Sequence, residues 1–271
     1  MLTSKQLVDI RELQKACEMG EPFELKLNWE MLQTRPENEI YDFFHYENEK
    51  LVGFVGLYGF GNKVELCGMV HPEYRRRGIF TQLFKTAEKA MLERKYKQIL
   101  LNAPSKSESA KEFLKTITCS YSFSEHQMKW NEQELSKQED VSLRPSTEED
   151  LEIEIQLDVQ CFGYEEEDAR EHNEQVRLVD QYSIIVWDGK SVGKMRISHT
   201  DGEAWIYGFA IFPEYQGRGI GRKTLTNVVL EQHQNGFPIF LEVEAKNANA
   251  LKLYEACGFR AYHSQDYYVM L

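Results

Sequence analysis

One eight-residue pattern occurs twice in this chain, 141 residues apart. Residues 72–79 (PEYRRRGI) and residues 213–220 (PEYQGRGI) agree at six of eight positions. Upstream of them, residues 50–53 (KLVG) match residues 190–193 (KSVG) at an offset of 140. Two matches at nearly constant spacing indicate two copies of one structural unit. The length of 271 residues suits two domains of about 130 residues each.

The predicted strands follow the same division. In the first half, strands are expected over residues 41–46, 50–60, 63–70 and 98–101, with helices over 78–95 and 107–116. In the second half, strands are expected over residues 142–145, 182–187, 191–198, 203–212 and 238–244. Because residues 1–20 have a mostly helical pattern, we expect the first half to lack a full opening strand.

The second copy of the repeat places three glycines where a buried strand meets a helix. Pro213 ends the apolar run 205–212, and an amphipathic helix opens within residues 216–221. Glycines at such a junction let backbone N–H groups approach a phosphate, and the positive end of the helix dipole lies behind them. The spacing Gln216-x-x-Gly219-x-Gly221 fits neither the dinucleotide fingerprint nor the P-loop. A tight turn before a helix is the alternative explanation.

A second pattern follows the glycine loop. The strand at residues 238–244 (PIFLEVE) precedes Asn247 and Ala250, and then a short helix that ends in LYEACGF at residues 253–259. In this order the two patterns resemble the GNAT family of N-acetyltransferases, closest in spacing to those that acetylate the N-termini of ribosomal proteins. The resemblance implies an α/β fold of two tandem GNAT units, each a mixed, mostly antiparallel sheet flanked by helices. Mycothiol synthases are similar in this tandem layout.

The same resemblance implies acetyl-CoA as the co-substrate and indicates which residues bind it. The pantetheine arm would lie along the backbone of Phe209, Ala210 and Ile211, with one N–H group facing the thioester oxygen. Asn247 would hydrogen-bond the pantetheine or the adenosine diphosphate end, although a helix N-cap also explains this residue. The pyrophosphate would be held by the loop of Gln216, Gly217, Arg218, Gly219, Ile220, Gly221 and Arg222. Arg218, Arg222 and Lys223 would make this site locally positive.

Two residues are implied for catalysis, Glu242 as the general base and Tyr254 as the proton donor to the departing thiolate. An amine is mostly protonated at pH 7, so it needs a proton acceptor before it can attack. The alternation Leu-Glu-Val-Glu puts Glu242 and Glu244 on one face of the strand, and their spacing does not separate them. Core packing beside Leu251 and Phe259 is the alternative role of Tyr254.

The positions of the first half that align with these site residues have different residue types. Asn102 aligns with Glu242 and Leu114 with Tyr254. Ser107 aligns with Asn247, and Phe80 stands where the second half has Gly221. We therefore predict a degenerate GNAT-like domain over residues 1–130, a linker over 131–140 and a catalytic domain over 141–271. The three arginines at residues 75–77 are either an anion site or a solvated turn.

Composition excludes several other classes of function. The net charge of −12 argues against general nucleic-acid binding. The chain has no apolar stretch of membrane-spanning length, and its first residues carry charges where a signal peptide is apolar. Five scattered cysteines without a C-x-x-C pair, and histidines without metal spacing, predict a cytoplasmic protein that binds no metal.

These observations predict an N-acetyltransferase that moves an acetyl group from acetyl-CoA to a primary amine by direct attack in the C-terminal domain. The acceptor is either a small molecule, such as a polyamine, an aminoglycoside or an amino sugar, or a peptide N-terminus. The acidic run at residues 164–168 would suit a cationic amine, although most charge runs are simply solvated. A non-catalytic acetyl-CoA-binding regulatory module is the alternative. The acyl-chain preference and the oligomeric state stay open.

Overall fold

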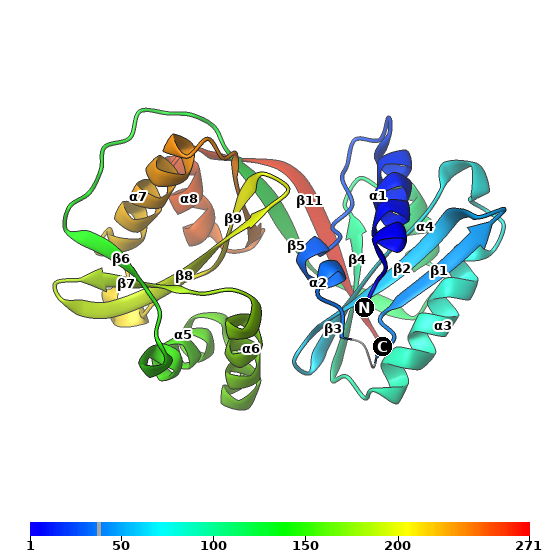
Figure 1. Ribbon diagram of the computed structural model, residues 1–271, viewed down its shortest axis with the longest axis horizontal. Helices are drawn as coiled ribbons and strands as arrows, with labels where there is room; N and C mark the ends of the chain where they lie inside the picture. Colours follow the sequence, from blue (N-terminus) through cyan, green and yellow to red (C-terminus); the bar gives the residue numbers. More distant parts are fainter. Residues whose placement is uncertain (37–38) are drawn as a thin grey trace. The chain divides into compact units, whose positions relative to one another are not determined.

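The computed structural model describes residues 1–36 and 39–271, and these form two compact units (Figure 1). Unit 1 consists of Met1–Ser124 and His263–Leu271, and unit 2 of Glu125–Tyr262. Each unit is an α/β structure in which helices flank a mixed sheet. This arrangement confirms the fold class expected from the sequence.

Unit 1 has the strand order β1-β2-β3-β4-β11-β5. Strands β3 and β4 are parallel, and the pairs β1–β2, β2–β3 and β4–β11 are antiparallel. Its strands are β1 (Asp42–Glu47), β2 (Lys50–Phe60), β3 (Lys63–Val70), β4 (Gln98–Pro104), the first part of β5 (Cys119–Trp130) and the last part of β11 (Phe259–Met270). Its helices are α1 (Ser4–Glu18), α2 (Trp29–Gln33), the 3-10 turn η1 (Pro72–Tyr74), α3 (Ile79–Glu93) and α4 (Glu108–Leu114).

Unit 2 repeats this plan with an additional first strand, in the order β6-β7-β8-β9-β10-β5. Strands β9 and β10 are parallel, and the other neighbours are antiparallel. The strands are β6 (Val141–Pro145), β7 (Ser183–Trp187), β8 (Lys190–Thr200), β9 (Glu203–Ile211) and β10 (Ile239–Glu244). The helices are the 3-10 turns η2 (Glu148–Asp150) and η3 (Pro213–Tyr215), α5 (Leu151–Phe162), α6 (Glu166–Val179), α7 (Ile220–Gln234) and α8 (Ala248–Ala256).

The repeated sequence pattern forms the same local structure in both units. Each copy makes a 3-10 turn and then a glycine in the left-handed region, Gly78 at φ 80° and Gly219 at φ 80°. A helix of 15 residues follows in each, α3 in unit 1 and α7 in unit 2. In the described residues no strand precedes α1, as expected for the first half.

The last strand of each predicted domain crosses to the other unit, which the sequence did not indicate. Strand β5 begins in unit 1 and ends in unit 2, where Glu125–Lys129 pair with β10. Strand β11 begins in unit 2 and ends in unit 1, where Gln265–Val269 pair with β4. The compact units therefore differ from the predicted ranges 1–130 and 141–271, while the predicted linker belongs wholly to unit 2.

Apolar cores lie on both faces of each sheet. In unit 1, α3 packs on one face through Leu83 and Phe84, and α1 packs on the other through Ile10 and Leu13. In unit 2, α7 and α8 cover one face, and Leu225 of α7 and Phe259 are completely buried there. The helices α5 and α6 pack together, and α5 also contacts β8 and β9. Across residues 1–36 and 39–271, none of the helices combines the length and apolarity that a bilayer crossing requires.

Candidate active site

The sheet of unit 2 opens between its two parallel strands. The register of β9 with β10 runs only from Ala204 to Ile206, opposite Ile239 to Leu241. Beyond Ile206, β9 continues to Ile211 and stays paired with β8. This part of β9 has a bulge opposite Lys194 and Arg196, and the bulge contains Gly208 at φ 55°. A bulge bends its strand locally. The backbone of Phe209, Ala210 and Ile211 therefore borders an opening on the β10 side.

The glycine loop lies directly after this part of β9. Gly217 and Gly219 both have positive φ, and a Cβ atom at either would meet nothing within 4 Å. Gly219 is the N-cap of α7, and no side chain caps the helix there. The amide of Gln216 donates a hydrogen bond of 2.8 Å to the carbonyl of Ile211, so this predicted ligand holds the loop onto the strand. The first backbone N–H groups of α7 are thus left for another acceptor.

The basic residues around the loop differ in the contacts that their side chains make. Arg218 lies 5.7 Å from the ring of Trp187 and 5.5 Å from that of Tyr215, and Arg222 is exposed. Lys223 forms an ion pair of 2.5 Å with Asp140. Asp140 therefore offsets part of the positive charge that Lys223 is expected to add to the site. Ile220 is buried in the core of unit 2, so only its backbone can contact a ligand.

Glu242 is half-buried on β10, and its partner comes from strand β5. The Nε2 group of Gln127 donates a hydrogen bond of 3.1 Å to Oε1 of Glu242. The Oε1 atom of Gln127 is buried and has no hydrogen-bond partner in the described part of the chain. Glu244, on the same strand, pairs with Lys246 at 2.5 Å. The two glutamates that the sequence could not separate therefore differ in partner.

Tyr254 of α8 lies in the apolar core of unit 2. Its side chain is 8% exposed, and its ring centroid is 6.1 Å from that of Phe259. Burial, together with the nearby Cys257 thiol, raises the pKa of Tyr254 to about 12. Core packing, the alternative considered for this residue, is thus part of its role.

Asn247 is the N-cap of α8. Its Oδ1 atom accepts a hydrogen bond of 3.1 Å from the backbone N–H of Ala250. Ser107 does the same for α4, where its hydroxyl accepts from the N–H of Ala110 at 3.3 Å. The two aligned residues therefore share one structural role, whatever else Asn247 contacts.

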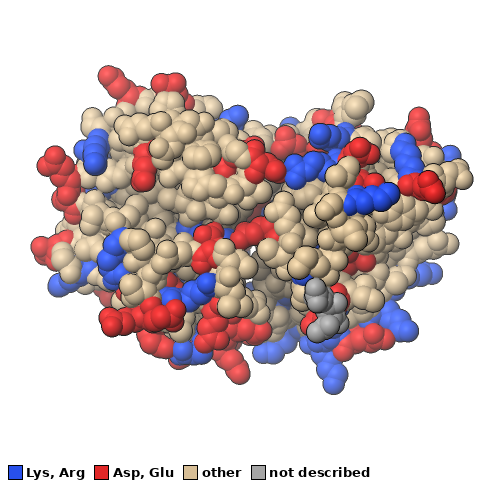
Figure 2. All heavy atoms as spheres, viewed as in Figure 1, with Lys and Arg blue, Asp and Glu red and all other residues tan. Residues whose placement is uncertain are grey.

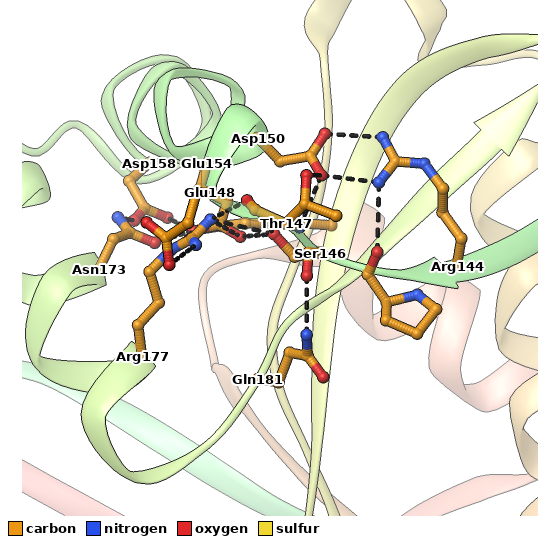
Figure 3. Close-up of polar contacts among 12 residues, drawn as sticks. Arg144, Ser146, Thr147, Glu148, Asp150, Glu154, Asp158, Asn173, Arg177 and Gln181 are labelled. Atoms are coloured by element: carbon orange, nitrogen blue, oxygen red, sulfur yellow. Dashed lines mark hydrogen bonds and ion pairs between the residues drawn. The ribbon is translucent and has the colours of Figure 1, made fainter.

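A network of buried polar contacts connects the start of α5 with α6 (Figure 3). Glu154 is completely buried, and it accepts hydrogen bonds from Ser146 at 2.5 Å and from Arg177 at 3.0 Å. Arg144 makes two hydrogen bonds of 2.7 Å to Asp150 and so holds the pKa of that carboxyl well below its usual range. These contacts fix the two helices to each other and to the end of β6.

A second buried pair extends the network to the sheet. Lys194 of β8 is completely buried, and its ammonium lies 2.8 Å from Asp158 of α5. Asn173 of α6 donates to Asp158 at 2.6 Å and accepts from Lys194 at 2.9 Å. Three elements therefore meet at one charge pair.

Acidic side chains gather over α5 and α6 on the face seen in Figure 2. The predicted acidic run lies in the turn after α5 and in the first turn of α6. Carboxylates in the first turn of a helix are stabilised by its dipole, which explains them without a ligand. Arg170 also pairs with Glu152 at 2.7 Å and with Glu166 at 3.8 Å. Within the described residues, no three His, Cys, Asp or Glu side chains are grouped so that they could hold a metal ion.

Comparison with known proteins agrees with this geometry. The model of the Acetyltransferase (GNAT) family matches residues 7–116 and again residues 147–259. The [ribosomal protein bS18]-alanine N-acetyltransferase of Escherichia coli (strain K12) is 41% identical over 58 residues, which are 21% of this chain and 39% of that protein. The chain thus spans about two fifths of the length of that curated relative. The N-alpha-acetyltransferase RimI of Mycobacterium tuberculosis is 29% identical over 132 residues, covering 45% of this chain and 80% of that protein.

A solved structure extends the likeness to the whole chain. It is a tandem GNAT protein from the clavulanic acid biosynthesis pathway, with a TM-score of 0.74 and 14% identity, covering 98% of this chain and 94% of that one. At this identity the likeness concerns the fold alone. The family match covers most of both units, and we conclude that this chain belongs to the GNAT acetyltransferase family and contains its fold twice.

Proposed function

We propose that unit 2 transfers an acetyl group from acetyl-CoA to a primary amine. One observation carries this proposal: Glu242, held by Gln127, lies on β10 next to the point where β9 and β10 separate. A carboxylate there can accept a proton from an amine that enters the opening. We also propose a cytoplasmic location, since the five cysteines are free thiols.

The residues around the opening suit acetyl-CoA. The uncapped N-terminus of α7 and the two open glycines, Gly217 and Gly219, offer backbone N–H groups to a pyrophosphate. The exposed Arg218 and Arg222 would add positive charge. Gln216, Gly221 and Asn247 would contact the same cofactor. An N–H group among Phe209, Ala210 and Ile211 would donate to the thioester oxygen. One such preorganised donor is worth about 3 kcal/mol in acyl transfer.

The proton transfers follow from the two side chains. Glu242 takes a proton from the amine, directly or through a water, and the neutral amine attacks the thioester carbon. The C–S bond then breaks, and the thiolate takes a proton from Tyr254. With a pKa of about 12, Tyr254 stays protonated at neutral pH and so has this proton to give. A thiol has a pKa of about 8.5, so the transfer is uphill and depends on close placement of the phenol.

We propose a peptide α-amine as the acceptor to test first, and a small-molecule amine second. One curated relative is named as an alanine N-acetyltransferase of ribosomal protein bS18, and the other as an N-alpha-acetyltransferase. An α-amine has a pKa near 8, so Glu242 can deprotonate it at neutral pH at a smaller cost than a lysine amine. The buried Oε1 of Gln127 would accept a hydrogen bond from the same amine.

The test is a thiol-release assay with acetyl-CoA and a panel of peptides and amines, on wild type, Glu242→Gln and the matched variant Glu244→Gln. We expect Glu242→Gln to lower kcat by at least about a hundredfold, as for other general bases. Glu244→Gln should stay within about threefold of wild type. If Glu244→Gln lowers kcat more than Glu242→Gln does, the general base is Glu244. Binding of acetyl-CoA without release of thiol with any acceptor would favour a non-catalytic module.

A further inference from the structure

Strand β1 is the outer edge of the sheet of unit 1. It pairs with β2 on one side, and no strand within residues 1–36 and 39–271 pairs with its other side. Strand β7 of unit 2 corresponds to β1, because each pairs with the strand that carries the repeated Lys-x-Val-Gly pattern. The outer side of β7 is paired with β6 along Ser183–Trp187. The two units therefore differ in whether this edge is covered by a further strand.

The backbone of β1 directs every second residue's hydrogen-bonding groups outward. Tyr41 lies opposite Leu57, and its carbonyl accepts a hydrogen bond of 2.8 Å from the N–H of Leu57. Hydrogen-bonded and non-hydrogen-bonded pairs alternate in an antiparallel ladder. The N–H and C=O groups of Asp42, Phe44 and Tyr46 therefore point away from β2. Outward-pointing groups on an edge strand are a template for pairing with another strand.

The carboxylates nearest these outward-pointing residues each have a basic partner within unit 1. The ion pairs are Arg35–Asp42 at 2.8 Å, Lys5–Asp9 at 2.7 Å and Arg94–Glu39 at 3.6 Å. Two large apolar side chains flank the same stretch, Ile40 with 68% and Tyr46 with 40% of its surface exposed. The protein as a whole has a net charge of −12. The edge of β1 is thus a nearly neutral, partly apolar part of an acidic protein.

The residues of β1 are complementary to themselves in antiparallel register. Pairing centred on Phe44 places Phe44 opposite Phe44 of a second copy, and Asp42 opposite Tyr46 of that copy. Over residues 41–47 this register sets no two carboxylates opposite each other. Each opposed pair of outward-pointing residues can exchange two main-chain hydrogen bonds. The arrangement is two-fold symmetric, as in most dimers of identical chains.

We infer that unit 1 binds a second copy of this chain, by antiparallel pairing of β1 with β1 of the copy into one continuous sheet. Two proteins of the same net charge repel each other, so they meet best where their surfaces are neutral and apolar. The paired carboxylates around β1 meet that condition, whereas they offer little attraction to a strongly charged partner. This inference concerns unit 1 and does not depend on the proposed acetyl transfer.

The test is sedimentation equilibrium of the intact protein between about 1 and 200 µM, the range in which small interfaces associate. The mass should rise with concentration from 31.8 kDa toward twice that value. Association should be as strong or stronger in high salt, because salt screens the repulsion between two acidic proteins. A mass of 31.8 kDa at every concentration, or a dimer that dissociates as salt is added, would overturn the inference.

A matched pair of variants assigns the contact to the backbone of β1. Tyr46→Pro removes an outward-pointing N–H group and leaves the ladder with β2 intact. Tyr46→Ala loses the same side chain, including its hydrogen bond of 2.9 Å to Asp9, but keeps the N–H group. Tyr46→Pro should associate at least about tenfold more weakly than Tyr46→Ala, because a two-fold interface loses the hydrogen bond twice. Equal association of the two variants would refute pairing through this edge.

A second pair tests the register and remains available if Tyr46→Pro does not fold. Tyr46→Asp places a carboxylate opposite Asp42 of the copy, whereas Tyr46→Lys places a cation there. The Asp variant should therefore associate at least about fivefold more weakly than the Lys variant. The control is Met19→Asp, at an 80% exposed residue at the end of α1, which should associate like wild type. Equal association of the Asp and Lys variants, or a loss in Met19→Asp, would contradict the proposed contact.

Discussion

The buried pair of Lys194 and Asp158 gives a prediction whose size follows from its surroundings. The Lys194 ammonium has no exposed surface, and besides Asp158 it contacts Asn173 at 2.9 Å and the ring of Tyr182 at 4.2 Å. Burial lowers the pKa of Lys194, and the negative charge of Asp158 opposes this shift. The variant Asp158→Leu removes that opposition and leaves a buried cation without its ion-pair partner.

The loss of folding stability caused by Asp158→Leu depends on pH. A lysine without its counterion loses its proton on folding, whereas in the unfolded state it keeps a pKa of about 10.4. The upper limit of the cost is 1.36 kcal/mol for each pH unit below that value, about 4.6 kcal/mol at pH 7 and about 1.9 kcal/mol at pH 9. Since the unfolded state binds the additional proton, the stability of the variant rises with pH relative to wild type.

The assay is urea unfolding at pH 7, 8 and 9, followed by tryptophan fluorescence. Three of the four tryptophans, Trp130, Trp187 and Trp205, lie in unit 2 and report on its unfolding. The double variant Asp158→Leu/Lys194→Met carries no buried charge at this position, so its loss of stability should not vary over this range. A cost of Asp158→Leu that is constant or grows with pH would refute the reasoning, because it would mean that Lys194 stays charged or is solvated.

Two further predictions concern the opening of unit 2. Tyr254→Phe should lower kcat at least tenfold and leave the acetyl-CoA affinity near that of wild type, because only the phenol hydroxyl is removed; unchanged turnover in a thiol-release assay would limit Tyr254 to packing. Gly221→Phe should abolish acetyl-CoA binding by calorimetry, whereas Gly221→Ala should still bind, because a Cβ atom there meets Ile211 at 3.4 Å and Leu253 at 3.5 Å in ordinary contact. Binding by both variants would show that the loop is not the pyrophosphate site.

The sequence predicted those parts of the fold that depend on local pattern. The helices that follow the two copies of the repeat, α3 and α7, begin where the sequence predicted a helix, because the turn residues that precede a helix act locally. The bounds of β2 and β3 agree with the predicted ranges, because each is a continuous apolar or alternating run with turn residues at its ends. The tandem GNAT fold followed from these signals.

Long-range pairing was not predictable in this way. Nothing in the residues of β5 and β11 says which sheet edge they pair with, so the exchange between units was missed. Gln127 was not predicted as part of the site for the same reason. It comes from the first half of the chain and contacts Glu242 in unit 2. The Lys194–Asp158 pair was missed for the same reason, since its two residues are 36 positions apart and match no motif. A strong alternation of polar residues along β5 is the one signal that could have suggested a strand there.

The exchange of strands also sets the order in which the newly made chain can fold. The edge of β4 in unit 1 pairs with Gln265–Val269, and these residues leave the ribosome about 145 positions after Ser124. At roughly 5–20 residues per second, synthesis of that stretch takes about 7–30 s. During this time β4 has an open edge, which is a site for wrong pairing and for chaperones. The unit that is translated first is therefore the one that is completed last.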